Sequence, residues 1–145
     1  MLLPGHLELF VLVHFAITYK KVENAKKNLP FDLRIPQYLP VGLKLADVRI
    51  EGEKSVMQAT LECEGEGKNI KIVQRGISTN SSTGISYDVE DAVVKNITIG
   101  DFPATLFLMK NERVMICWRE EGIFYKLLGN TSESETIKIA NNLSK

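Results

Sequence analysis

The feature that most constrains this chain is a pair of apolar runs, Ala104–Lys110 and Arg113–Arg119, separated only by Asn111 and Glu112. Two polar residues between two such runs predict a β-hairpin. The cross-strand pairs are then Met109 with Val114, Phe107 with Ile116 and Thr105 with Trp118 on one face, and Leu108 with Met115 and Leu106 with Cys117 on the other. Both faces are therefore apolar, and a turn of different length would change the partners but not this property. One layer of helices covers only one face, so the curl of the sheet, a second subunit or an apolar ligand must cover the other.

The rest of the chain from residue 43 onward has the same strand-like character. Apolar and polar residues alternate with a period of two in Met57–Glu64, which is typical of a half-buried strand. Together with the hairpin, seven strands are predicted: Leu43–Ile50, Met57–Glu64, Ile70–Arg75, Ala92–Ile99, Ala104–Lys110, Arg113–Arg119 and Ile123–Leu128. Most of the turns between them are too short for a crossover helix, which favours antiparallel pairing of sequence neighbours. Ser132 and Glu135 form a capping box that predicts a C-terminal helix.

Residues 1–29 differ in kind from this pattern and are predicted to form an apolar N-terminal helix. No Gly or Pro interrupts His6–Leu29, and apolar residues recur there at spacings of three or four. The half before Tyr19 is apolar nearly all round, so we expect protein, either the rest of the domain or a second copy, to cover it. Phe10, Val13 and Ile17 are the candidate partner-binding residues. The sequence does not decide whether Leu7–Ile17 is the end of a membrane anchor. It therefore does not decide whether the protein associates with a membrane.

Length and composition narrow the class of protein. The chain of 145 residues has 18 basic and 18 acidic residues, so its formal net charge is zero. This length favours one compact domain over 30–145 after the helix, and the absence of a basic excess argues against nucleic acid as a partner. The predicted fold class is α+β: a curled antiparallel β-meander of about seven strands with an N-terminal and a C-terminal helix.

No pattern in the sequence points to catalysis. His6 and His14 are two helical turns apart and cannot share one metal ion, so neither a metal nor another cofactor is expected. Cys63 and Cys117 are predicted to be buried thiols, with a disulfide between them or a reactive role as the alternatives. Nucleophile elbows, phosphate-binding loops and dinucleotide fingerprints do not occur. We therefore expect the protein not to be an enzyme.

The candidate ligand-binding residues are large, adaptable apolar side chains of the late strands. Methionine and aromatic residues suit an apolar cleft that adjusts to its ligand. The residues chosen on this ground are Phe107, Met109, Met115, Trp118 and Tyr125. The alternative is that these side chains fill an ordinary core.

Two motifs make residues 29–143 resemble an uncharacterised domain family of Gram-positive bacteria that is found beside anti-sigma-factor and sporulation components. The first is Pro-x-x-Leu-Pro-x-Gly, matched by Pro36, Leu39, Pro40 and Gly42. The second is Trp-x-x-x-Gly-x-x-Tyr-x-Leu-x-Gly, matched by Trp118, Gly122, Tyr125, Leu127 and Gly129. The family is similar in fold to MucB/RseB and lipoprotein-carrier proteins, in which a curled antiparallel sheet holds helices and binds acyl chains or a protein partner. The resemblance implies an extracytoplasmic location and no catalytic residue.

These observations lead to one expected function and one alternative. We expect a non-catalytic extracytoplasmic binding or sensing module that engages a protein partner or an apolar ligand, either acyl or peptide. The alternative is a structural dimerisation domain without a small ligand, built around the apolar N-terminal helix.

Overall fold

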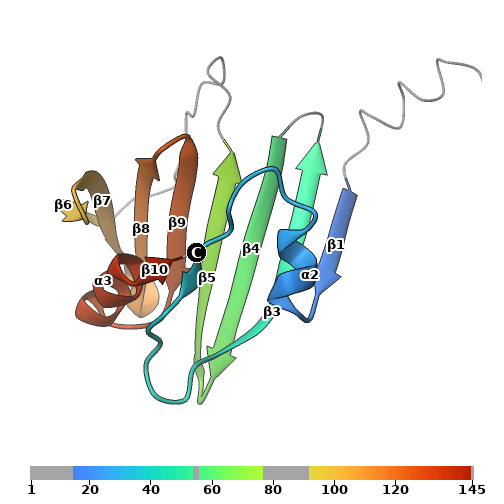
Figure 1. Ribbon diagram of the computed structural model, residues 1–145. Helices are drawn as coiled ribbons and strands as arrows, with labels where there is room; N and C mark the ends of the chain where they lie inside the picture. The colour runs from blue at the N-terminus through green and yellow to red at the C-terminus, as the bar shows by residue number, and fades with distance from the viewer. Residues whose placement is uncertain (1–14, 54–55, 77–91, 145) are drawn as a thin grey trace, which may run out of the picture.

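The computed structural model describes residues 15–53, 56–76 and 92–144, which form one eight-stranded antiparallel sheet and two short helices (Figure 1). The strand order in the sheet is β1-β3-β4-β5-β9-β8-β7-β6. Its strands are β1 (Phe15–Tyr19), β3 (Lys44–Glu53), β4 (Val56–Gly65), β5 (Lys68–Gly76), β6 (Val93–Ile99), β7 (Phe102–Met109), β8 (Arg113–Glu120) and β9 (Ile123–Gly129). The helices are α2 (Val22–Lys26) and α3 (Glu133–Asn141), and Lys110–Glu112 forms a single 3-10 turn, η1.

All seven predicted strands are confirmed, and the predicted α+β class with them. In β4 the alternation places Ala59, Leu61 and Cys63 in the core, whereas Glu62 and Glu64 lie on the opposite face. The period-two pattern identified β4 because one of its faces must be buried, whereas β7 and β8 were identified as apolar runs on either side of a short turn.

The meander is interrupted once, between β5 and β6. Strand β5 pairs with β9 instead of β6, so the hairpins β3–β4–β5 and the run β6–β7–β8–β9 meet in the middle of the sheet. Every other pair of sequence neighbours from β3 to β9 does pair. Short turns join those pairs and force the neighbouring strands to lie side by side. The connection from β5 to β6 is long enough to reach the far edge of the sheet.

The predicted N-terminal helix is confirmed only over Val22–Lys26, and its predicted extent is wrong for Phe15–Tyr19. Phe15–Tyr19 is strand β1, paired antiparallel with β3, and only Val22–Lys26 is helical. Four of the five residues are β-branched or aromatic and favour strands: Phe15, Ile17, Thr18 and Tyr19. The segment therefore forms a strand that pairs with β3, although its apolar residues also have helical spacing. As a helix it would lack apolar partners along the whole length of its apolar stripe. Phe10 and Val13 lie outside the described residues, and Ile17 lies on β1.

The C-terminal helix is confirmed and is hydrogen-bonded to the connector that precedes β3, which we define as residues 34–43. The Ser132 side chain accepts a hydrogen bond from the backbone N–H of Glu135 at 3.2 Å, as expected for the N-cap of α3. The Glu135 carboxylate in turn accepts a hydrogen bond from the Tyr38 hydroxyl. Strand β10 (Leu143–Ser144) pairs with β2 (Ile35–Pro36), which closes this contact between the two ends of the domain.

Both helices lie over one face of the sheet, which we call the helix-side face (Figure 1). The main core lies there: β3, β4, β5, β8 and β9 contribute Val48, Ile50, Ala59, Leu61, Ile70, Ile72, Ile116, Trp118, Tyr125 and Leu127, and the covering segments contribute Ala25, Leu33, Ile139, Ala140 and Leu143. We call the opposite face the outer face. Among the described residues, no helix packs against it.

The register of the late hairpin differs by one residue from the prediction. Met109 pairs with Arg113, Phe107 with Met115 and Leu106 with Ile116, because the turn contains Lys110 as well as Asn111 and Glu112. Asn111 and Glu112 both have positive φ angles, 63° and 59°. Both faces of the hairpin nevertheless remain apolar, as predicted.

Candidate functional site

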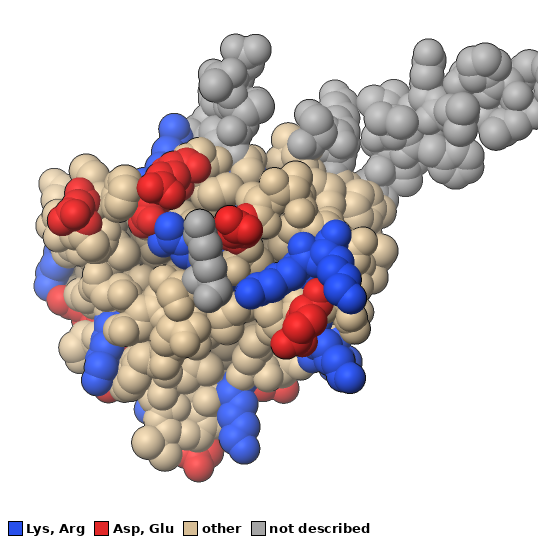
Figure 2. All heavy atoms as spheres, viewed as in Figure 1, with Lys and Arg blue, Asp and Glu red and all other residues tan. Residues whose placement is uncertain are grey.

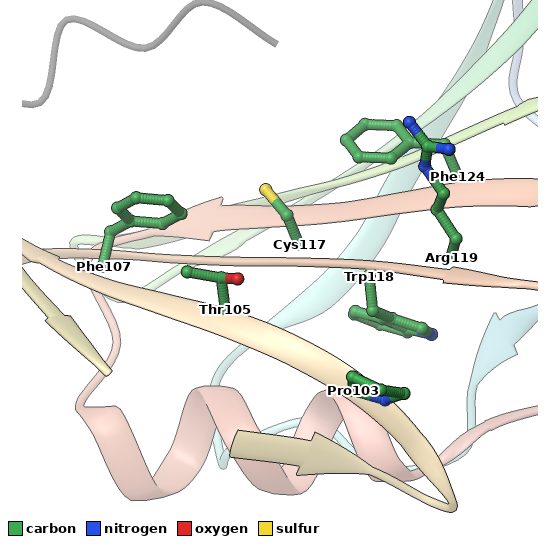
Figure 3. Close-up of a pocket in the computed structure, with 7 residues that line it drawn as sticks. All are labelled: Pro103, Thr105, Phe107, Cys117, Trp118, Arg119 and Phe124. Atoms are coloured by element: carbon green, nitrogen blue, oxygen red, sulfur yellow. The ribbon is translucent and has the colours of Figure 1, made fainter. Parts of the chain in front are cut away.

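The outer face carries a hollow over β7, β8 and β9. Its volume is about 390 Å³, at the lower end of the range of roughly 300–1,000 Å³ that is typical of ligand pockets. The residues that border it are Pro103, Thr105, Phe107, Cys117, Trp118, Arg119 and Phe124. Figure 3 shows Phe107, Cys117 and Phe124 on one side of the strands and the Trp118 indole on the other side, towards α3. The surface of the hollow is therefore mostly aromatic and apolar.

A second apolar cluster forms the floor of this hollow, separate from the main core. Phe107, Met115, Cys117 and Phe124 are buried in it, and Met109 and Leu128 pack against them. The register brings these side chains together, since Phe107 faces Met115 and Met115 faces Leu128 across neighbouring strands. The sheet thus has apolar clusters on both faces, and the two helices cover only one of them.

Basic side chains surround this outer-face cluster. Arg75, Phe124 and Arg119 are direct cross-strand neighbours on β5, β9 and β8, and Lys126 lies between Val73 and Cys117. The Arg75 guanidinium lies 5.2 Å from the centre of the Phe124 ring, which is within the range of a cation–π contact. Lys71 and Arg113 lie on the same face.

Acidic residues are segregated away from the hollow. Among the described residues of β5 to β9, no Asp or Glu points to the outer face. The acidic positions on that face belong to β3 and β4, where Glu62 meets Lys71 across the boundary at 3.6 Å. The helix-side face, by contrast, shows interspersed acidic and basic side chains (Figure 2). The charge around the hollow favours a ligand with an anionic group.

The structure divides the five residues predicted to bind a ligand between the two faces. Phe107, Met109 and Met115 belong to the outer-face cluster, whereas Trp118 and Tyr125 lie in the main core. The five side chains therefore do not share one face of the sheet, and their role in binding a ligand stays a prediction. Trp118 and Tyr125 are 4% and 2% exposed, with their rings packed in the main core.

Trp118 and Tyr125 stack on each other beneath the connector before β3. Their ring centres are 5.0 Å apart with an angle of 12° between the planes, and the Arg34 guanidinium lies 5.4 Å from the centre of the Tyr125 ring. Arg34 also forms an ion pair with Glu120, and its backbone exchanges two hydrogen bonds with the Gln74 side chain, at 2.9 and 2.8 Å. Burial raises the pKa of the Tyr125 phenol. This cluster joins the connector to the sheet and is a structural element.

Phe124, Arg75, Arg119 and Lys126 are site residues that the sequence analysis missed. Phe124 and Lys126 alternate with Tyr125 and Leu127, so the period-two pattern of β9 contained this signal. Arg75 could not be found in this way, because only the pairing of β5 with β9 brings it to Phe124.

The two cysteines lie on opposite faces of the sheet and are both buried thiols, as predicted. Burial, with a smaller contribution from Glu62, raises the pKa of Cys63 to about 12. A disulfide between Cys63 and Cys117 is excluded by their positions. Cys117 borders the hollow.

Over the residues that the structure describes, no group of His, Cys, Asp and Glu side chains is arranged to hold a metal ion. In the same residues, no helix is both long enough and apolar enough to span a bilayer. His6 and His14 lie outside the described residues.

The motif residues noted in the sequence have structural positions. Gly42 has a φ of +92°, a backbone conformation in which any other residue would be strained, so the turn before β3 favours glycine. A Cβ on Gly129 would lie 2.4 Å from the carbonyl oxygen of Asn69. Pro36 pairs with Leu143, and Trp118 stacks on Tyr125. These residues maintain the fold, and the hollow is built mainly from other positions.

No curated protein and no solved structure matches the chain. A family model for a domain of unknown function, DUF4367, matches residues 34–143, which include the connector, β2 to β9, α3 and Leu143. The match covers both motifs and every residue that borders the hollow. The chain therefore belongs to the DUF4367 family.

Proposed function

We propose that this protein is a non-catalytic binding module whose outer face holds an amphiphilic anion, with the apolar part in the hollow and the charged group among Arg75, Arg119 and Lys126. The observation that carries the proposal is the combination of an apolar hollow with a rim of basic side chains and no acidic ones over β5 to β9 of the described chain. An apolar cluster that served only as core would not require this segregation of charge.

The ligand we favour is an acyl chain with a carboxylate or phosphate head group. The volume of the hollow suits a short apolar segment, and arginine binds carboxylates and phosphates with paired hydrogen bonds. A protein partner that inserts an apolar side chain next to a carboxylate would present the same chemistry. The test below distinguishes such a partner from an acyl chain.

The family resemblance supports the same proposal from a different direction. The similarity to MucB/RseB and lipoprotein-carrier proteins implies binding of acyl chains or of a protein, outside the cytoplasm. We propose that this chain also acts there and that it needs no cofactor. Dimerisation is the second candidate function, and the exposed apolar side chains of β1 favour it.

The test is thermal unfolding of the full chain with dodecyl compounds that differ only in the head group. A ligand that binds only the folded state raises the melting temperature, so we expect the largest rise with dodecanoate, a smaller one with a neutral dodecyl maltoside and the smallest with dodecyltrimethylammonium. All three are used below their micellar concentrations.

Variants of the basic rim show where the ligand binds. Because hydrogen bonds to charged groups contribute roughly 1.5–3 kcal/mol, Arg75→Gln and Arg119→Gln should each weaken dodecanoate binding by about tenfold or more. Arg49→Gln, on the outer face of β3, is the matched control and should have no effect. The acyl proposal is refuted if dodecanoate binding is absent or if these variants do not weaken it. An acidic apolar peptide that binds where dodecanoate does not would identify a protein as the occupant.

A further inference from the structure

Strand β1 is an edge strand with an unusual composition. Among the described residues it pairs only with β3, in an unbroken register from Phe15 to Tyr19. Phe15 is 42% exposed and Ile17 is 48% exposed, and both point to the helix-side face, as Ile17 faces Ile50. Edge strands of soluble proteins are usually protected against pairing by a charge, a proline or a bulge. Strand β1 has none of these.

The other edge of the sheet does carry such protection. Strand β6 has Lys95 near its centre, and the Lys95 ammonium contacts the Glu133 carboxylate of α3 at 3.0 Å. Val93 and Val94 of β6 are as exposed as Ile17, at 55% and 53%. Exposed apolar residues therefore occur at both edges, but only β1 combines them with an uncharged strand.

We propose that β1 is a dimerisation strand that pairs antiparallel with β1 of a second copy. A twofold axis through Ile17 aligns all five residues: Ile17 meets Ile17 of the partner subunit, Phe15 meets Tyr19 of the partner subunit and Ala16 meets Thr18 of the partner subunit. The two sheets then join into one, and the contact closes as a symmetric dimer because the same surface is used by both copies. The interface lies at the opposite end of the sheet from the hollow, so this inference is independent of the ligand proposal.

In this register, side chains on the helix-side face complement each other, and the outer face of the seam carries only small residues of β1. On the helix-side face, Phe15 and Ile17 gain apolar neighbours, which cross-strand pairs favour. On the outer face, the small residues Ala16 and Thr18 separate charges of opposite sign. Glu51 of β3 lies beside Ala16, and Arg49 lies beside Thr18. Within each subunit these two side chains already form an ion pair, with 3.4 Å between Arg49 Nε and Glu51 Oε1, so they place no uncompensated charge beside the seam.

The oligomeric state of the full chain tests the proposal, measured by sedimentation velocity with circular dichroism as the check of folding. We expect the natural sequence to be a dimer, Ile17→Lys to be a folded monomer, and Val94→Lys to remain a dimer. Val94 is the matched control because it is equally exposed on the other edge strand. A monomeric natural chain, a dimeric Ile17→Lys variant, or dissociation caused by Val94→Lys would each overturn the proposal.

A cysteine at the twofold axis tests the register in a second way that does not depend on destabilising the dimer. Directly opposed residues of antiparallel strands have Cα atoms roughly 4.5–5.5 Å apart, which permits a disulfide. Ile17→Cys should therefore form a disulfide-linked dimer under mild oxidation, whereas Val94→Cys should not. Cys63 and Cys117 are buried and should not contribute. The register is wrong if Ile17→Cys does not crosslink or if Val94→Cys crosslinks equally well.

Discussion

Trp118 is the residue whose environment differs most from the sequence-based expectation of an adaptable cleft. It is only 4% exposed, stacks on Tyr125, and its indole N–H has no hydrogen-bond partner among the described residues. A buried donor without a partner has a cost of about 1–3 kcal/mol, which the packing of the ring must exceed.

Replacing Trp118 with Ala should therefore lower the free energy of unfolding by about 3–5 kcal/mol, as expected for a large aromatic side chain removed from a core. Trp118→Phe should cost much less, because it keeps the stack and removes the unpaired donor. Urea denaturation followed by circular dichroism measures both values, since Trp118 is the only tryptophan. A cost below about 1 kcal/mol for Trp118→Ala would place the ring in an open cleft instead.

Cys63 gives a prediction about pH. Its pKa is raised from 9.0 to about 12 in the folded protein. Below pH 9 the thiol keeps its proton in both states, so its contribution to stability is complete. Between pH 9 and about 12 the unfolded chain loses this proton first, so the folded state loses stability as pH rises. The unfolding free energy of Cys63→Ala should fall less steeply over this range, and parallel profiles for the two proteins would contradict the assignment.

At the scale of elements, the turn between β7 and β8 explains why the hairpin register was mispredicted. Asn111 and Glu112 adopt left-handed conformations, and Lys110 joins them in a three-residue turn. Asparagine tolerates this conformation, but glutamate does so only at a cost. Sequence patterns predict that a turn exists, whereas the number of residues in the turn depends on the energetic cost of their backbone conformations.

Glu112→Gly should consequently stabilise the protein by about 0.5–1 kcal/mol, because the steric relief is larger than the added entropy of the unfolded chain. Asn111→Gly is the control and should change stability by less than about 0.5 kcal/mol. Chemical denaturation gives both differences, and a destabilising effect of Glu112→Gly would show that the glutamate side chain makes a contact worth more than the strain.

The other predictions of strands and helices were likewise correct or wrong according to whether the deciding signal is local in the sequence. The seven predicted strands and α3 were found because period-two patterns and the capping box are local signals. Strand β1 was missed because Val11, Phe15 and Tyr19 also fit a helical spacing, and pairing with β3 is a tertiary contact that no local pattern contains. The conclusion that both faces of the late hairpin are apolar survived the register error, because it depends on composition and not on the partners.

For the whole molecule, a formal net charge of zero conceals a segregation of charge on the outer face. Arg75 reaches the site only because β5 pairs with β9, and the meander expected from the sequence would have placed β6 beside β5. The basic rim of the hollow is thus a product of topology, which sequence periodicity does not determine.

The proposed function requires the apolar outer face of β7 to β9 to be a ligand surface. Nuclear Overhauser effects between the labelled protein and bound dodecanoate test this most directly. We predict contacts from the methylene protons to the rings of Phe107 and Phe124, and none to the indole of Trp118. Contacts to Trp118 and Tyr125 instead, on the helix-side face, would contradict the account.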